Sequence, residues 1–420
     1  MFILYLLQYL DKTSLGYSAI MGIIDDTKLE GTDYSWASSF FYVGFLVASP
    51  SSALALVKFP VAKVVVVTVL IWAGVHMCMA AGHDFGSLAA LHIFLGVFEA
   101  AINPGFTIIT SMWYKPSEHA LRHGLWYGGA SIAYIFGGIL AYAISHINGA
   151  IKSWQVFFVH YIWSSNLFMG ACDVFFLPSN PQTPYFLNAG KRKQAFARVQ
   201  GIRHSAYTRR WQNAQMKEAL LDPRSWLLFL LCVFTTLPGG GLAAFGSIIT
   251  KSFGYTLFQT QLLGMVTGVF LLIFVIITVT LSMAFKNVRC LSMALLNLIS
   301  LVGCLMIKLL PASQKWGRLG GLWLIGAYAS AFPTILSLVS SNITGHTKKA
   351  TVNDGLQYHD CLFVLNIVII LTMRQTVAWW NEKRDQELGS VEVLSAESAE
   401  DVLVELDETN WENKSIRYSL

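Results

Sequence analysis

Long apolar runs, each close to the length that crosses a bilayer, alternate with short polar stretches along most of this chain. A helix rises about 1.5 Å per residue, so roughly 20 apolar residues span the hydrocarbon core. Such runs occur about eleven times by hydropathy alone, at residues 1–24, 35–57, 61–81, 86–112, 124–146, 153–177, 225–250, 262–285, 288–310, 317–341 and 360–380. This pattern predicts an all-α polytopic membrane protein.

The composition also indicates a lipid environment. Hydrophobic residues make up 55% of the 420 residues and charged residues only 13%, whereas a soluble domain carries about 25% charged residues. The formal net charge of +5 is modest and no basic patch accompanies it, so we expect no nucleic acid among the partners. The six cysteines are isolated, with no metal-ligand or redox spacing, so we expect no metal and no cofactor.

The charges of the loops predict the orientation of the helices. Basic residues concentrate in alternate loops, and loops rich in lysine and arginine remain in the cytoplasm. The intervening loops at 25–34 and 83–86 are poor in basic residues, although the loop with Lys315 and Arg318 is an exception. The basic series comprises Lys58, Lys63, Lys115, Arg122, nine residues within 178–224, Lys286, Arg289, Lys348 and Lys349.

One long polar stretch, 178–224, divides the chain into two halves. Six predicted spans fall in 1–177 and the others in 225–380. Short basic turns follow the second span of each half. Two helical bundles related by a pseudo-repeat and joined by a cytoplasmic linker are the plan of the major facilitator fold. The acidic tail, 381–420, is predicted to be disordered and cytoplasmic.

Several motifs, in order along the chain, resemble one family. YLDKTSLGYSAIMG at 9–22, FLGVFEAAINPGF at 94–106 and SSNITGHTKKATVN at 340–353 are similar to the allantoate permease branch of the fungal anion:cation symporters, within the major facilitator superfamily. The resemblance implies import of small organic anions (ureides, carboxylates or small peptides) together with protons. We therefore expect the anion, protons and the lipid bilayer as partners, and a monomer in the plasma membrane.

Three departures from the family pattern qualify this expectation. His92 stands where members usually carry arginine, so a fixed bidentate charge is replaced by a side chain that can be neutral. Pro238 to Gly241 and Ala244 replace a stretch that usually contains two amides. We also expect one span of the C-terminal half and the cytoplasmic leader to be missing, which raises the alternative of a truncated chain.

Glu99 lies in the middle of the apolar run that we expect the bundle to surround. A charged side chain at this depth costs about 2.5–3.5 kcal/mol on insertion scales, which favours a substrate or proton pathway. His92 lies two helical turns away on the same face, and we predict that the two residues exchange protons. The alternative is a structural pair in which Lys12 or His92 holds the glutamate.

The first span carries two further charges, Asp11 and Lys12. We predict that Lys12 attracts the anion and that Asp11 orients it or relays protons. An ion pair that only joins helices is the alternative.

Four other residues complete the predicted pathway, one of them Asn103 on the fourth span. Gly239 and Gly240 belong to a Pro–Gly stretch that is predicted to break the seventh span at the site. Lys251 is either part of the pathway or a snorkelling anchor at the membrane edge. His76, in the third span, is interpreted as a structural histidine.

Five loop residues are predicted either to form a cytoplasmic gate or to act only as topology signals: Lys115, Arg122, His346, Lys348 and Lys349.

Two classes of function compete. The first is a secondary active transporter that imports a small organic anion with protons, by rocking two bundles about a midplane site. The second is a membrane protein without transport activity, either a substrate sensor or a truncated, inactive paralogue. An integral-membrane enzyme is disfavoured, because the sequence contains no metal cluster, nucleophile motif or nucleotide-binding loop.

Overall fold

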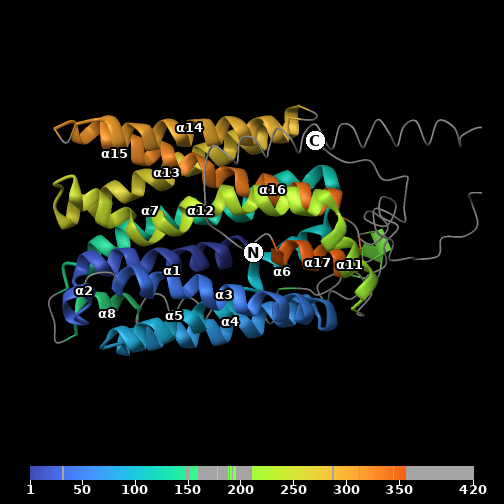
Figure 1. Cartoon of the computed structure of the whole chain (residues 1–420), viewed down its shortest axis with the longest axis horizontal. Coiled ribbons are helices and arrows are strands. Elements are labelled where there is room, and N and C mark those ends of the chain that lie inside the picture. The colour runs from blue at the N-terminus through green and yellow to red at the C-terminus, as the bar shows by residue number, and fades with distance from the viewer. Residues whose placement is uncertain are drawn as a thin grey trace, which may run out of the picture.

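The computed structural model describes residues 1–30, 33–147, 151–158, 177, 188, 190–191, 193–194, 211–285, 288–311, 313–343 and 345–355. All elements within these residues are helices, and the long ones run side by side along the long axis of the molecule (Figure 1). Most of the predicted sixth span, most of the linker, the last predicted span at 360–380 and the tail at 381–420 lie outside the described residues.

The first five predicted spans of the N-terminal half coincide with observed helices, with small shifts at the ends. The helices are α1 (Phe2–Met21), α2 (Ile23–Asp26), α3 (Asp33–Lys58), α4 (Val61–Cys78), η1 (Met79–Ala81), α5 (Phe85–Glu99), α6 (Ile102–Trp113), η2 (Pro116–Glu118), α7 (His119–Ile144) and α8 (Ser153–Val156).

In the C-terminal half, the predicted spans that lie within the described residues also coincide with observed helices. Its helices are α11 (Asn213–Leu221), α12 (Pro223–Ser252), α13 (Leu257–Ala284), α14 (Arg289–Leu309), α15 (Lys315–Ile325), η4 (Gly326–Ala331), α16 (Phe332–Asn342) and α17 (His346–Gly355). Across the described part of both halves, seven helical segments are long and apolar enough to cross a membrane.

Prolines affect these helices in two ways. The fourth span divides into α5 and α6 at Ala100–Ala101, just before Pro104, because proline has no N–H to donate to the carbonyl four residues earlier. In contrast, α12 continues as one helix through Pro238 and the glycines that follow. The predicted break in the seventh span is therefore wrong. Membrane helices tolerate such residues when neighbouring groups satisfy the freed backbone.

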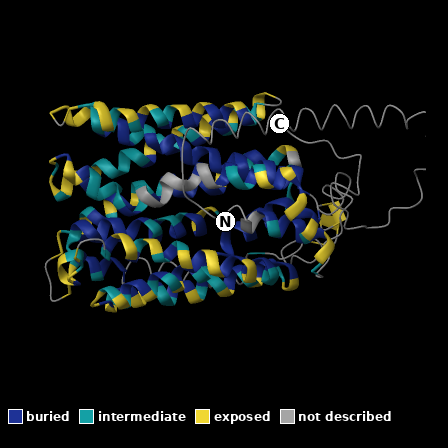
Figure 2. Cartoon of the chain, in the orientation of Figure 1, coloured by how far each residue is buried: buried dark blue, intermediate teal, exposed yellow. Residues whose placement is uncertain are grey.

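The burial pattern is that of a protein whose solvent is lipid. Large apolar side chains lie on the perimeter, where Val47 and Leu309 are each 72% exposed. Polar side chains such as Gln8 and Thr107 are buried between helices, and buried residues concentrate where helices face one another (Figure 2). Lipid tails can cover the apolar perimeter, whereas buried polar groups need partners inside the bundle.

The two halves pack against each other through α7 with α13 and through α1 with α12. In Figure 1, the blue helices of the N-terminal half lie at the bottom and the yellow and orange helices α13–α15 at the top, with α7 and α12 between them. The backbones approach closely here, since a Cβ atom added to Gly138 would lie 2.7 Å from the carbonyl oxygen of Gln261. The described helices are thus arranged as two bundles with a shared interface, at which the candidate site lies.

Candidate functional site

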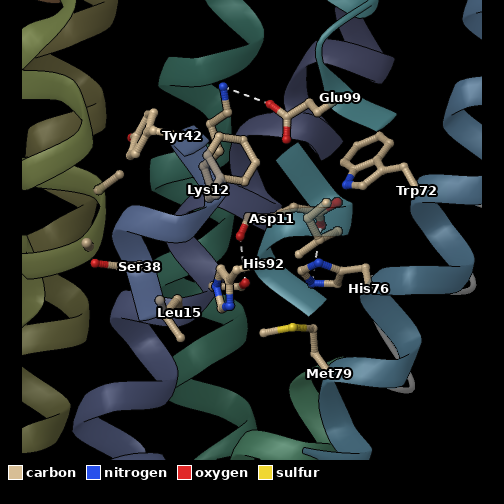
Figure 3. Close-up of a pocket in the computed structure, with 15 residues that line it drawn as sticks. Asp11, Lys12, Leu15, Ser38, Tyr42, Trp72, His76, Met79, His92 and Glu99 are labelled. Carbon is tan, nitrogen blue, oxygen red and sulfur yellow. Dashed lines mark hydrogen bonds and ion pairs between the residues drawn. The ribbon is translucent and has the colours of Figure 1, made fainter. Parts of the chain in front are cut away.

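A small cavity lies between α1, α3, α4, α5 and α12, halfway along α1 (Figure 3). Its volume is about 40 Å³, and a water molecule needs about 10–15 Å³ on this measure, so water fits but an organic anion does not. Its ionisable lining includes four of the predicted pathway residues and one additional histidine: Asp11, Lys12, His92, Glu99 and His76.

Lys12 and Glu99 form a direct ion pair at one end of this cavity. Lys12 Nζ lies 2.7 Å from Glu99 Oε1, and Gln8 Nε2 donates a hydrogen bond to the same oxygen at 2.8 Å. The Glu99 side chain is 1% exposed, but that of Lys12 is 22% exposed. The structural alternative named Lys12 as the partner of Glu99, and the structure shows that contact. The carboxylate is therefore enclosed, whereas the lysine side chain lines the cavity and is partly exposed.

The local sequence explains how these groups meet. Gln8 and Lys12 are four residues apart on α1, so they lie one above the other on the same face. Glu99 is the last residue of α5, immediately before the break that Pro104 imposes. A carboxylate at a helix C-terminus is opposed by the helix dipole, and the Lys12 ammonium and Gln8 amide stabilise it there instead.

Asp11 faces the opposite end of the cavity, towards two histidines (Figure 3). His76 Nε2, on α4, lies 3.8 Å from Asp11 Oδ1, which is too long for a hydrogen bond but within reach of an ion pair. His92 is held differently, because its Nδ1 atom lies 2.9 Å from the carbonyl oxygen of Leu88. The two histidines therefore differ in how far their rings are already committed.

The rest of the cavity wall is aromatic and apolar. Phe41, Tyr42 and Trp72 contribute rings, and the Lys12 ammonium lies 5.5 Å from the ring centroid of Phe41, a favourable cation–π distance. Within the part of the chain that the structure describes, the C-terminal half contributes Ala243 and Ala244 to the lining. Almost all of the polar chemistry of this cavity thus comes from the N-terminal half.

Contacts between the halves close the bundle at the end that we predict to face outside. Tyr34 Oη donates a 2.8 Å hydrogen bond to the carbonyl oxygen of Ala244. Next to it, a Cβ atom on Gly16 would lie 2.7 Å from the carbonyl oxygen of Ala243, so only glycine allows α1 to approach α12 this closely. On the same side, Gln261 Nε2 donates to Ser145 Oγ at 2.7 Å.

A second charged cluster lies at the predicted cytoplasmic end. Lys348, at the start of α17, is 0% exposed, and its Nζ atom lies 2.9 Å from Glu218 Oε1 and 2.8 Å from Asp222 Oδ2. Asp222 caps α12 and also binds the Arg224 guanidinium in a bidentate pair, at 2.9 and 3.0 Å. We call these four residues the Lys348 cluster. All four charged side chains of this cluster are buried within the protein.

The environment of Asp222 sets the protonation state of this cluster. Burial alone would raise the pKa of Asp222, but hydrogen bonds from Arg224 and the charges of Lys348 and Arg224 more than offset that effect and hold the pKa below its ordinary value. Asp222 therefore stays ionised at physiological pH.

At this predicted cytoplasmic end, one neighbouring contact joins the two halves and a second lies within the C-terminal half. His123 Nε2, on α7, lies 3.0 Å from Ser340 Oγ on α16, and Lys349 Nζ donates to the carbonyl oxygen of Ser340 at 3.3 Å. The predicted gate residues Lys348 and Lys349 thus lie among buried contacts. Whether they gate the pathway stays a prediction.

The other predicted residues lie outside the cavity lining. Asn103 is buried on α6, and Lys251 is exposed on the last turn of α12. Gly239 and Gly240 lie within the continuous helix α12. Of the remaining gate residues, His346 begins α17, Lys115 is half-buried, and the Arg122 guanidinium carbon lies 4.2 Å from the ring centroid of Tyr114.

Sequence reasoning missed three participants. Gln8 precedes Lys12 by one helical turn. This spacing could have predicted that its amide lies beside the charged side chain. The position of His76 could also have been used, because a titratable residue within an apolar span is by default a candidate for a functional site. Glu218 had no such signal, since 130 residues separate it from Lys348 and only the fold brings them together.

Comparisons with known proteins fit this architecture. Residues 1–352 match the Major Facilitator Superfamily. The "Uncharacterized transporter C757.13" of Schizosaccharomyces pombe is 35% identical over 356 residues, covering 84% of this chain and 67% of that protein. The "Allantoate permease" of Saccharomyces cerevisiae is 28% identical over 469 residues, covering 100% of this chain and 84% of that protein.

Solved structures share the fold. The proton:xylose symporter XylE, bound to 6-bromo-6-deoxy-D-glucose, aligns with a TM-score of 0.60 at 11% identity, over 89% of each chain. The chain spans about two thirds of the length of the first three curated relatives, at 67%, 66% and 69%. A family match over most of the chain, a 35% identical transporter and the shared helical fold lead to one conclusion. This chain is an integral, multi-pass membrane protein of the major facilitator superfamily.

Proposed function

We propose that this protein imports a small organic anion together with protons, by alternating access. Two of its relatives are named as a transporter and as an allantoate permease, which supports a transport activity. The observation that carries the finer proposal is the Lys12–Glu99 pair, in which a partly accessible ammonium group lies on a cavity and its carboxylate partner is fully enclosed.

Such a pair suits an anion that binds by exchange. A substrate carboxylate that reaches Lys12 replaces Glu99 as the partner of the ammonium group. Glu99 keeps its hydrogen bond from Gln8, and it can also take up a proton. Because a buried charge without a partner is costly, anion binding and protonation of the site favour each other. In this scheme the predicted roles of Asp11, His92 and Glu99 in proton movement remain proposals.

The cavity must open before it can accept an anion. At about 40 Å³ it is too small in this conformation. Opening to the outside separates Tyr34 from Ala244, and opening to the cytoplasm separates His123 from Ser340. These contacts lie on opposite sides of the cavity, so a rocking motion can break one set while the other remains.

The substrate that we propose is a ureide, a carboxylate or a small peptide. Likeness to a protein named allantoate permease supports this class, and so does the single lysine on the cavity, which suits one carboxylate. We further propose that the protein acts as a monomer in the plasma membrane.

A sensor without transport activity is the second candidate. Among the described residues, the C-terminal half lines the cavity with Ala243 and Ala244, whose side chains offer no hydrogen bond to a polar substrate. A protein that binds an anion on one half alone has less reason to couple binding to movement of the other half.

Uptake distinguishes the two candidates. The tagged chain is expressed in yeast that lacks its own ureide permeases, and labelled allantoate is supplied over a pH series, with surface expression measured in parallel. We expect uptake that rises as the outside pH falls and that nicotinate or dipeptides compete for. Protein at the surface without uptake of allantoate, nicotinate or dipeptide would favour the sensor.

A further inference from the structure

His76 lines the cavity, yet its ring nitrogens form no hydrogen bond with the described residues. It is 1% exposed, and neither ring nitrogen has a hydrogen-bond partner in the part of the chain that the structure describes. Its ring packs 5.1 Å from that of Phe158 on one side. A polar side chain that is buried without a hydrogen bond costs free energy, so its presence beside a cavity points to a partner acquired during function.

We propose that His76 carries the proton that accompanies the anion, with Asp11 as its counter-ion. This proposal rests on the proposed function and assigns the proton to one residue of that site. The proton arrives from the outside solution when the cavity is open to it. It binds a ring nitrogen of His76 without any change in covalent bonds between heavy atoms, and it leaves to the cytoplasm after the anion.

The other titratable groups around His76 are already engaged. His92, on α5, places Nδ1 against the carbonyl oxygen of Leu88 at 2.9 Å. Glu99 accepts hydrogen bonds from both Lys12 and Gln8. His76 is the imidazole of this cavity whose two nitrogen atoms are both available within the described residues.

The distance to Asp11 suits a contact that forms only after protonation. Neutral imidazole and Asp11 stand 3.8 Å apart. A charged imidazolium gains both an ion pair and a hydrogen bond by closing about 1 Å of that distance, which a small rotation of either side chain achieves. Asp11 therefore lies close enough to pair with His76 once the imidazole is protonated.

Charge balance gives the reason for coupling. One lysine, Lys12, faces two carboxylates, Asp11 and Glu99, around the cavity. With both carboxylates ionised, the site carries a net negative charge, and a substrate anion adds a second one. One proton on His76 cancels that addition, so the anion binds more favourably when the histidine is charged.

The test separates net uptake from exchange in the same yeast cells. Net uptake of labelled allantoate and labelled nicotinate is measured at outside pH 5.5 and 7.5. Exchange is measured in cells that are preloaded with the unlabelled compound and treated with a protonophore, so that no proton gradient contributes. For the wild type we expect uptake about tenfold higher at pH 5.5, the increase in protonation of an imidazole that the open cavity exposes to the outside solution.

His76→Gln is expected to reduce this acid stimulation to less than about twofold while exchange persists. Asp11→Asn is expected to do the same, and the double variant is expected to be no worse than either single one. His83→Gln is the matched control, because His83 lies exposed on the loop before α5 and its loss should leave the tenfold response intact.

Three outcomes would overturn the proposal. Full acid stimulation in His76→Gln or in Asp11→Asn would exclude the pair as the proton carrier. Loss of exchange together with net uptake, with His76→Gln at the surface, would make His76 a binding or packing residue. Loss of stimulation in His92→Gln but not in His76→Gln would assign the proton to His92. Failure of the proposed function looks different, since the wild type itself would then show neither uptake nor exchange.

Discussion

Two lysines of this protein are paired with carboxylates inside the bundle, and they differ in how much of the ammonium group remains accessible. Lys12 has one carboxylate partner, borders a cavity and is 22% exposed. Lys348 has two carboxylate partners and is 0% exposed. The first lysine can exchange its partner for a ligand, whereas the second is saturated by the protein itself.

The comparison shows that a charged residue in a membrane protein need not be a site. The sequence alone marked both lysines as candidates, Lys12 for the pathway within the first span and Lys348 for a cytoplasmic gate. Their surroundings separate a residue that is available to a ligand from one that joins three helices. For Lys348 these are α11, α12 and α17, through Glu218 and Asp222. Four experiments can break or sharpen this distinction.

The largest effect is expected for Lys348→Met. The substitution conserves most of the volume but leaves Glu218 and Asp222 buried near each other without their shared cation. Removing one partner of a buried ion pair typically costs about 3–5 kcal/mol of unfolding free energy. We expect a lower melting temperature of the purified protein and less protein at the cell surface. Normal amounts of a protein as stable as the wild type would show that the cluster does not stabilise the fold.

Lys12→Met is expected to impair transport beyond the stability that it loses by leaving the buried Glu99 carboxylate without its cation. It removes the ammonium group that we assign to the anion, while Glu99 keeps its bond from Gln8. Losing a charged partner costs about 2 kcal/mol or more, or about 30-fold in apparent affinity. Uptake per molecule at the surface measures this. Unchanged uptake would leave Lys12 with only a structural role.

Glu99→Gln is expected to have a smaller effect, and in the opposite direction. Without the competing carboxylate, Lys12 is free for the anion, so the concentration for half-maximal exchange should fall by about five- to tenfold, or about 1–1.4 kcal/mol. The pH dependence of net uptake should weaken if Glu99 also takes part in proton exchange with His92. A weaker exchange affinity would contradict competition between Glu99 and the substrate.

The smallest effect is expected from pH on the Lys348 cluster. Because the pKa of Asp222 is lowered in the folded state, its contribution is fully present above the ordinary carboxyl pKa, about 3.9, and is lost as pH falls through the lowered value. The difference in melting temperature between wild type and Asp222→Asn should therefore stay constant from pH 5 to 8. A difference that changes over this range would make the cluster a pH sensor.

The sequence predicted the fold because the free energy of transferring a helix into the bilayer depends on the local composition of the chain. Apolar runs of sufficient length located the helices of both halves within the described residues. The continuous path of α12 through Pro238 could not be predicted in this way, because the groups that rescue a membrane helix come from neighbouring helices. Prolines at 104 and 238 look alike in sequence and differ in outcome.

The candidate site was predictable where one residue carried the signal. A carboxylate at membrane depth identified Glu99, and Lys12 followed as the basic group able to hold it. The pairing of His76 with Asp11 and the Lys348 cluster depend on contacts between helices far apart in sequence. Such contacts form only in the folded bundle, so no regular spacing of residues in the sequence reveals them.

The division of the fourth span at Ala100–Ala101 has a mechanical consequence. Pro104 has no N–H for the carbonyl of Ala100, so the helical ladder already lacks one hydrogen bond at this break, and bending there costs less than in an unbroken helix. Glu99 is the last residue on the outer arm of the span, and the inner arm, α6, leads to Lys115. Swinging of the inner arm can therefore move the predicted cytoplasmic loop without carrying Glu99 away from Lys12.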